Sequence, residues 1–153
     1  PMLKENSPVS PMAPEPCLNL SLRKADRVIN HVYNRHLAEC GLSVSQFSVM
    51  RAMHYAGTCT SQVIQDILVL DQTTLSRNLK KLVSDGMVVM KEDKGDRRRK
   101  LLSLSAKGKI MFSAGEKQWK LAQNEMRETL GNSIADQIIE LSDAIVGKCG
   151  TPI

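Results

Sequence analysis

The sequence predicts a mainly α-helical fold that carries one small β-hairpin, and three observations support this class. Apolar residues recur at helical spacing through most of residues 17–146. Two short apolar runs, at 87–91 and 101–104, flank a polar and strongly basic segment, as in a hairpin. A short helical pattern at 61–68 ends only two residues before Asp71, which can cap the next helix. Two helices joined by so tight a turn and followed by a hairpin predict a winged helix-turn-helix.

The helix expected between Asp71 and Gly86 has an apolar and a polar face. Its cap would be the Asp71 side chain, and Gly86 suits the left-handed residue that ends a helix. The expected buried stripe consists of Leu75, Leu79, Leu82 and Val83. The opposite face carries hydroxyl groups and long cations, which can reach base edges and phosphates: Thr73, Ser76, Arg77, Lys80 and Ser84. For this helix taken alone, an ordinary solvated surface is the alternative.

The connection between the two apolar runs of the hairpin is strongly basic. It holds Lys94, Gly95, Asp96, Arg97, Arg98, Arg99 and Lys100. Cations packed on one loop repel each other, and a polyanion would relieve that repulsion. Residues 71–109 contain 11 Lys/Arg and 5 Asp/Glu, whereas the other 114 residues contain 10 and 11. The positive excess therefore lies on this helix and hairpin, as expected of a protein that binds nucleic acid.

The remaining elements predict a dimer. They are, in order, a long helix over 17–40, a helix from Ser43 or Ser45 to Gly57, a brief strand over 58–60, a helix over 106–130 capped by Ser105, and a helix over 133–146. The first and last helices have apolar stripes without a partner in a small winged head. We therefore expect two copies of the chain to interleave these helices around a twofold axis. The expected organisation is a tail at 1–16, a helical dimerisation region at 17–40 and 106–147, and a winged helix-turn-helix at 41–105.

The composition excludes several other classes of protein. The chain has 153 residues, of which 42% are hydrophobic, enough for a real core. Only 3% are aromatic, which argues against a surface that stacks RNA or single-stranded bases. No run of eighteen apolar residues and no signal segment occurs, so we expect a cytoplasmic protein without a membrane span. Residues 1–16 hold five of the six prolines and are expected to form a mobile tail.

The residues resemble those of the MarR-type bacterial transcription regulators over 18–146. The segment from Asp96 to Gly108, DRRRKLLSLSAKG, is similar to that family's D-x-R-x-x-x-L-x-L-[TS]-x-x-G signature. Supporting matches are Leu42-Ser43 with Gln46-Phe47, and Leu82 with Gly86-Met87-Val88. Two positions depart from the pattern, because Met90 stands where a polar residue is common and Ile64 where alanine is usual.

The resemblance implies a homodimer whose two winged lobes bind a pseudo-palindromic site in double-stranded DNA. It implies that Asp96 pairs with Arg98 to hold the wing, so that an arginine enters the minor groove. It places four side chains of the preceding helix in the major groove: Gln72, Thr74, Ser76 and Arg77. It also implies a ligand pocket between the dimer helices and the winged lobe.

The signal that such a regulator would sense has two candidate sites. Met50, Met53, His54 and Trp119 are possible lining for a small-molecule pocket, although methionines at helical spacing are equally expected in a plain core. Cys17 opens the first helix, where the peroxide-sensing branch of the family carries its reactive cysteine. Reduced thiols without a sensing role are the main expectation for Cys17, Cys40, Cys59 and Cys149. The histidines, His31, His36 and His54, lack metal-binding spacing, so no metal or cofactor is expected.

The function predicted is that of a homodimeric transcription regulator, in the first instance a repressor. Its DNA affinity would fall when a small effector or an oxidant changes the spacing of its two lobes. No nucleophile context, Gly-rich phosphate loop or HExxH motif occurs, so an enzyme is not expected. The alternative is a winged helix that docks an acidic protein partner.

Overall fold

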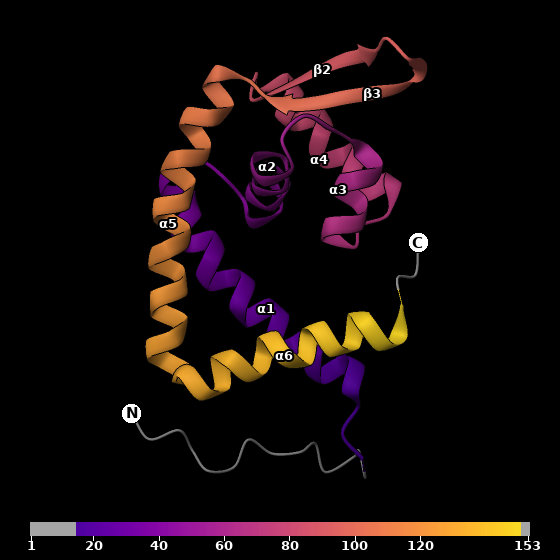
Figure 1. Cartoon of the computed structure of the whole chain (residues 1–153). Coiled ribbons are helices and arrows are strands. Elements are labelled where there is room, and N and C mark those ends of the chain that lie inside the picture. Colours follow the sequence, from indigo (N-terminus) through magenta and orange to yellow (C-terminus); the bar gives the residue numbers. More distant parts are fainter. Residues whose placement is uncertain (1–14, 151–153) are drawn as a thin grey trace.

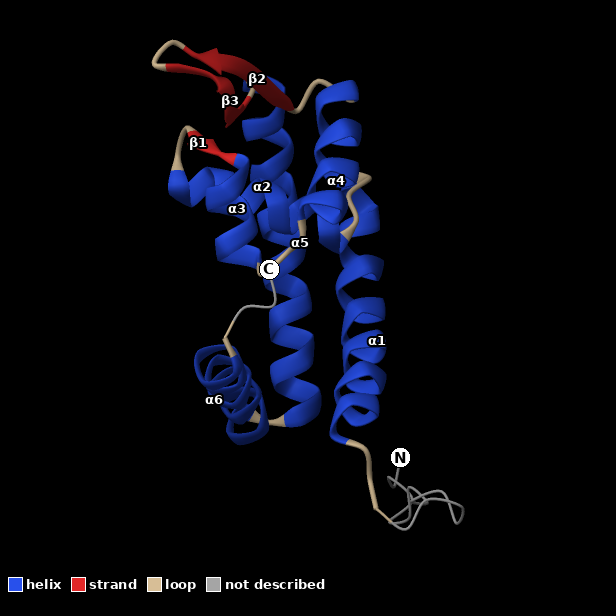
Figure 2. Cartoon of the chain, turned by 90° about the vertical axis from the view of Figure 1, so that its right-hand side faces the viewer, coloured by secondary structure: helices blue, strands red, loops and turns tan. Residues whose placement is uncertain are grey.

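The computed structural model describes residues 15–150, and the predicted tail at 1–16 therefore lies, except for its last two residues, outside the described part. The predicted class is confirmed: the chain is mostly helical with one small antiparallel sheet (Figures 1 and 2). The elements are α1 (Leu18–Leu37), a 3-10 turn (Ala38–Cys40), α2 (Val44–Ala56), β1 (Cys59–Thr60), α3 (Ser61–Leu68), α4 (Gln72–Ser84), β2 (Val88–Asp93), β3 (Asp96–Leu104), α5 (Ala106–Leu130) and α6 (Asn132–Cys149).

Side-chain caps determine where the helices begin. Ser43 and Gln46 form a reciprocal capping box at the start of α2. The Ser105 hydroxyl accepts a hydrogen bond from the Gly108 amide at 3.0 Å and donates one to the Gly86 carbonyl at 2.6 Å. This second bond joins the start of α5 to the turn after α4. The predicted starts of these helices are therefore confirmed, and Gly86 has the expected left-handed φ of 75°.

The sheet has the order β1-β3-β2, with both pairings antiparallel. Only Lys94 and Gly95 connect β2 to β3, so the prediction of a seven-residue basic loop is wrong. Asp96 to Lys100 belong to β3, where Lys100 pairs with Glu92 across the ladder. The hairpin of β2 and β3 extends beyond the helices of the winged domain (Figure 2). Backbone hydrogen bonds between the two strands hold it together, and they do not depend on whether the exposed side chains are polar. The cations are consequently held along a strand.

The hydrophobic core lies between α2, α3, α4, the sheet and the first half of α5. Its largest fully buried side chains are Leu37, Met50, Met53, Ile64, Leu75, Leu82, Leu102 and Val49. The predicted stripe of α4 is confirmed for Leu75, Leu79 and Leu82, but Val83 is exposed. Eight residues after Leu75, Val83 is rotated about 80° around the helix from it and leaves the core. Gly108 and Gly115 let α5 approach this core closely, because a methyl group at either position would overlap a neighbour.

The long helices α1 and α5 lie side by side and connect the winged lobe to α6, which crosses the end of α5 (Figures 1 and 2). Tyr33 of α1 donates a hydrogen bond to Gln123 of α5. The apolar residues of α6 remain exposed in the single chain, among them Ile134, Ile138, Leu141 and Ile145. No helix within residues 15–150 is long and apolar enough to cross a membrane.

Candidate nucleic-acid interface

The turn between α3 and α4 fixes the direction of the polar helix. Val69 ends α3 in the left-handed region, with φ 54°, and its amide donates to the Gln65 carbonyl. Two residues later the Asp71 carboxylate accepts a hydrogen bond from the Thr74 amide at 2.7 Å. This bond holds the pKa of Asp71 below its ordinary value. The two helices therefore form the predicted helix-turn-helix, with α4 as its second helix.

The polar face of α4 is accessible to a ligand. Gln72, Thr73, Ser76, Arg77 and Lys80 are exposed, whereas Thr74 is half-buried. The Gln72 side-chain amide donates to the Ser76 hydroxyl at 3.1 Å, one turn along the helix. Hydroxyl, amide and guanidinium groups on one helix face are the groups that read base edges and bind phosphates.

Two aspartates shape the wing through backbone contacts. The Asp93 carboxylate accepts from the Gly95 amide and the Asp96 carboxylate from the Arg98 amide, both at 3.0 Å. The expected pair between the Asp96 and Arg98 side chains is therefore replaced by a bond to the Arg98 backbone. Lys94 and the cations of β3 are exposed: Arg97, Arg98, Arg99 and Lys100. None of these five cations forms an ion pair with an acidic side chain of residues 15–150.

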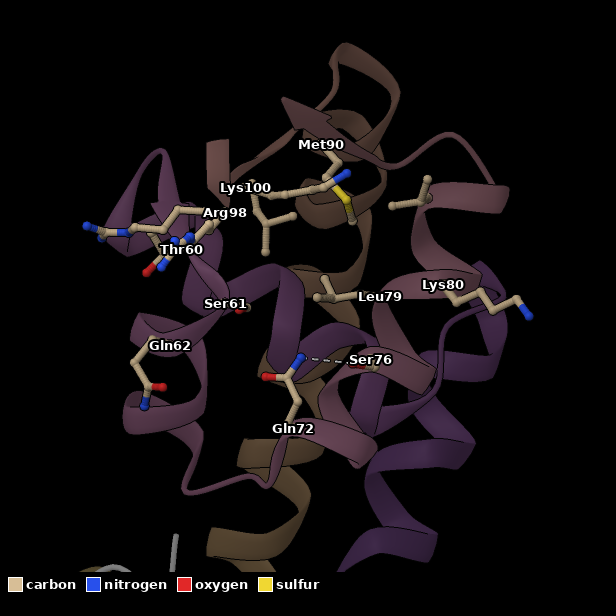
Figure 3. A pocket seen from close by; sticks show the side chains of 13 residues that line it. Thr60, Ser61, Gln62, Gln72, Ser76, Leu79, Lys80, Met90, Arg98 and Lys100 are labelled. Atoms are coloured by element: carbon tan, nitrogen blue, oxygen red, sulfur yellow. Dashed lines mark hydrogen bonds between the residues drawn. The ribbon is translucent and has the colours of Figure 1, made fainter. Parts of the chain in front are cut away.

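A groove of about 800 Å³ lies between α4 and the wing, and the first residues of α3 close its third side (Figure 3). Its floor is apolar, with Leu79, Met90 and Leu102. Its polar lining is Thr60, Ser61, Gln62, Gln72, Ser76, Lys80, Arg98, Arg99 and Lys100. The groove has no acidic lining residue, which suits a polyanion.

The comparisons with known proteins agree with this geometry. A family model described as "MarR family" matches residues 41–99, which span α2, the helix-turn-helix and most of the wing. YdgJ from Bacillus subtilis, named an uncharacterized HTH-type transcriptional regulator, is 25% identical over 118 residues, or 76% of this chain and 70% of YdgJ. The transcriptional regulator MOSR of M. tuberculosis, solved in complex with DNA, is 27% identical with a TM-score of 0.75, covering 86% of this chain and 98% of that one. Residues 41–99 therefore form a winged helix-turn-helix of the MarR family.

BpsR of Bordetella bronchiseptica has the same fold, although it is only 18% identical. Its TM-score is 0.79 over 88% of this chain and 96% of that one, and its structure concerns regulation of its DNA binding by 6-hydroxynicotinic acid. MarR-family regulators are DNA-binding transcription factors and not enzymes, so the chain is a DNA-binding transcription regulator.

The structure brings part of the predicted MarR-type reading surface together. Gln72, Ser76 and Lys80 line the groove with Arg98 and Arg99. Thr73 and Arg77 are exposed on α4 outside the groove lining, and Lys94 and Arg97 lie toward the tip of the hairpin. Sequence reasoning missed Thr60, Ser61 and Gln62 as lining residues. It named Lys100 among the cations of the hairpin connection, but not as part of a groove.

The four predicted pocket residues do not share one cavity. Met50 is fully buried in the core, so the core alternative is correct for it. Met53 and His54 line a cavity of about 580 Å³ beside Phe112, whose ring centroid is 4.4 Å from that of His54. Trp119 lines a separate cavity of about 450 Å³ between α1, α2, α3 and α5. This second cavity lies where α1 and α5 meet the winged helix-turn-helix.

The cysteines are all free thiols, and their environments differ. Cys17 is exposed and caps α1, where its sulfur accepts a hydrogen bond from the Leu20 amide at 3.4 Å. Burial raises the pKa of the Cys40 and Cys59 thiols, which makes both less reactive at neutral pH. Within the described part of the chain, no group of three or more His, Cys, Asp or Glu side chains could hold a metal ion.

Proposed function

We propose that two copies of this chain bind a pseudo-palindromic operator in double-stranded DNA and repress the adjacent gene. In each copy α4 lies in the major groove and the basic strand of the wing follows the neighbouring minor groove and its phosphates. The observation that carries this proposal is the acid-free groove (Figure 3), whose lining includes Gln72 and Ser76 of α4 together with Arg98 and Arg99 of β3. Base-reading amides beside phosphate-binding cations are the combination that a duplex requires.

The homodimer is supported by the apolar surface that one copy leaves uncovered. Leu18 at the start of α1 is 85% exposed and Leu141 in α6 is 63% exposed. Exposed apolar side chains gathered on the two terminal helices mark an interaction surface. In a twofold dimer, α1 and α6 of the second copy pack against α1 and α6 of the first, so the exposed apolar residues of both copies are covered together. In this proposal, residues 17–40 and 106–147 form the dimer and residues 41–105 bind DNA.

A small anionic effector would release the DNA by binding in the cavity of about 450 Å³. The Arg51 guanidinium at its wall lies 4.9 Å from the centroid of the Trp119 ring and 5.3 Å from that of Tyr55. A cation beside two aromatic rings favours a flat ligand that carries a carboxylate. The cavity joins α1 and α5 to the winged lobe, so its occupant would alter how the two lobes are spaced. The regulation of BpsR's DNA binding by 6-hydroxynicotinic acid, a flat molecule with a carboxylate, supports this class of effector.

An oxidant acting through Cys17 is the alternative signal. The exposure of this thiol at the start of α1 supports it, because a soluble oxidant can reach the sulfur. Cys17→Ser should abolish promoter release by an organic peroxide if this thiol is the sensor. Unchanged release by peroxide in that variant would remove the thiol hypothesis and leave the effector cavity.

Footprinting on the DNA that flanks the chain's own gene tests the proposed function. Protection of two half-sites about one helical turn apart is expected, and phenolic acids at millimolar concentration should remove it. Binding without any preferred site, at salt near physiological strength, would contradict an operator-binding role. A specific acidic protein partner in place of DNA would favour the alternative docking module.

A further inference from the structure

A chain of side-chain amides runs from the core of the winged lobe to the reading face of α4. Gln65, on α3, is one of the few buried polar residues, with 7% of its surface exposed. Its side-chain Nε2 donates a hydrogen bond to Oε1 of Gln72 at 2.5 Å. The Nε2 of Gln72 then donates to the Ser76 hydroxyl at 3.1 Å (Figure 3). The amide of Gln72 is therefore held from both sides, by a buried donor and by an exposed acceptor.

Gln65 is itself fixed in place by the turn between the two helices. Its backbone carbonyl accepts from the Val69 amide and from the Leu70 amide, the latter at 3.1 Å. The carbonyl and the side chain of one residue thus bond to both ends of the turn that leads into α4. A buried side chain with such contacts has few alternative rotamers. The orientation of Gln72 consequently depends on the core rather than on solvent.

The two bonds leave Gln72 with one further donor and one further acceptor. A carboxamide has two N–H groups and two oxygen lone pairs, and each neighbour uses one of them. The remaining N–H and lone pair match N7 and N6 on the major-groove edge of adenine, which glutamine binds with a bidentate pair. We infer that Gln72 reads an adenine in the operator and that buried Gln65 is the positioning residue that orients its amide for this contact. This inference rests on the proposed DNA-binding function.

Gln65 favours DNA binding because it orders the Gln72 side chain before DNA arrives. A free glutamine on a helix surface samples many rotamers, and immobilising such a side chain at an interface weakens binding by roughly two- to tenfold. Gln65 removes most of that penalty before DNA arrives. It should therefore raise discrimination at one base pair and leave affinity for unrelated DNA unchanged, which a merely structural residue would not do.

The test uses the full-length chain and a library of random duplexes. The wild type, Gln72→Ala, Gln65→Met and the matched control Gln118→Met are each used to select binding sequences. Gln118 is a half-buried glutamine of α5 that lies outside the lining of the groove. Affinities for the selected duplex, and for versions with one base pair replaced, are then measured by fluorescence anisotropy.

The expected result is loss of one A·T preference in Gln72→Ala and a roughly three- to tenfold weaker preference at that same pair in Gln65→Met. Gln118→Met should keep the wild-type preference there. Gln65→Met combined with Gln72→Ala should show no loss beyond that of Gln72→Ala alone, because the effect passes through Gln72. If Gln65→Met does not fold, Gln65→Asn replaces it, since its amide is one methylene too short to reach Gln72.

Three results would overturn the inference. One is full wild-type discrimination at that base pair in Gln65→Met. The second is an equal loss of affinity for all duplexes, which would assign Gln65 a structural role only. The third is a wild-type chain that selects no sequence at all, which would remove the proposed function together with the inference, whereas the first two results leave the proposed function intact.

Discussion

The imidazole Nε2 of His36 on α1 lies 3.1 Å from the carboxylate Oε1 of Glu125 on α5. The Arg35 guanidinium reaches the other oxygen of the same carboxylate at 2.5 Å. One acidic side chain therefore ties together the two helices that connect the winged lobe to the rest of the chain. The hydrogen bond from His36, followed by that from Arg35, holds the pKa of Glu125 below its ordinary value of 4.5.

Glu125→Gln should remove a pH-dependent part of the protein's stability. A carboxylate whose pKa is lowered by folding stabilises the native state above its unfolded pKa, and this contribution is lost as the pH falls through the folded pKa. The wild type should therefore resist urea better than Glu125→Gln at pH 7, and the difference should vanish on acidification below pH 4.5. Glu128→Gln, on the same helix without an ion pair among residues 15–150, is the control. A difference that stays constant from pH 7 to pH 3 would count against the ionic tie.

Replacing Arg97 and Arg98 by alanine should weaken binding to every duplex. Each lost phosphate contact lowers the slope of log affinity against log salt by about 0.9, because fewer counterions are released. The slope is measured by anisotropy titrations at several salt concentrations. The control replaces two exposed cations of α5, Lys117 and Lys120, and should keep the wild-type slope. Equal slopes for wild type and the wing variant would mean that the wing does not touch DNA.

Gly108→Ala should destabilise the fold by roughly 1–3 kcal/mol or more. A methyl group at this position would overlap the Met87 carbonyl, where the start of α5 packs against the turn before β2. Gly147→Ala is the matched control, because nothing lies within 4 Å of the added methyl and alanine favours a helix. Urea denaturation of both variants measures the difference, and equal midpoints would contradict the close approach at Gly108.

Leu141→Lys should shift the chain toward a single protomer without unfolding it. Leu141 is 63% exposed, so the substitution removes little from the protomer's own core, but it places a charge on the proposed dimer surface. Asp143→Lys places the same side chain on the opposite face of α6 and should leave the dimer intact. Sedimentation at several protein concentrations separates the two outcomes. A fully dimeric Leu141→Lys variant would exclude this face from the interface.

Local signals in the sequence were sufficient for the helices. Asp71 and Ser105 cap the helices that they were expected to cap, and Ser43, one of two candidates, caps α2, because a cap is set by residues within one turn of it. The start of β3 was mistaken for a loop, since a run of Asp96 and cations lacks strand propensity. Strand β2, which only Lys94 and Gly95 separate from it, supplies the hydrogen bonds that keep this segment extended.

The candidate site was predictable in its parts but not in its assembly. The polar face of α4 and the basic residues could be read from spacing and charge. The groove could not, because it requires α3 to approach β3, which no local pattern encodes. Gln65 gave no signal either, since a glutamine in a short helix is expected on the surface until its partner Gln72 is placed.

The account depends on two protomers presenting two winged lobes to one duplex. Light scattering on the full-length chain at micromolar concentration, alone and with the duplex that it selects, tests this directly. The predicted results are a protein mass of twice 17.0 kDa and a complex of two chains per duplex. A single 17.0 kDa protomer, or one chain per duplex, would contradict the account.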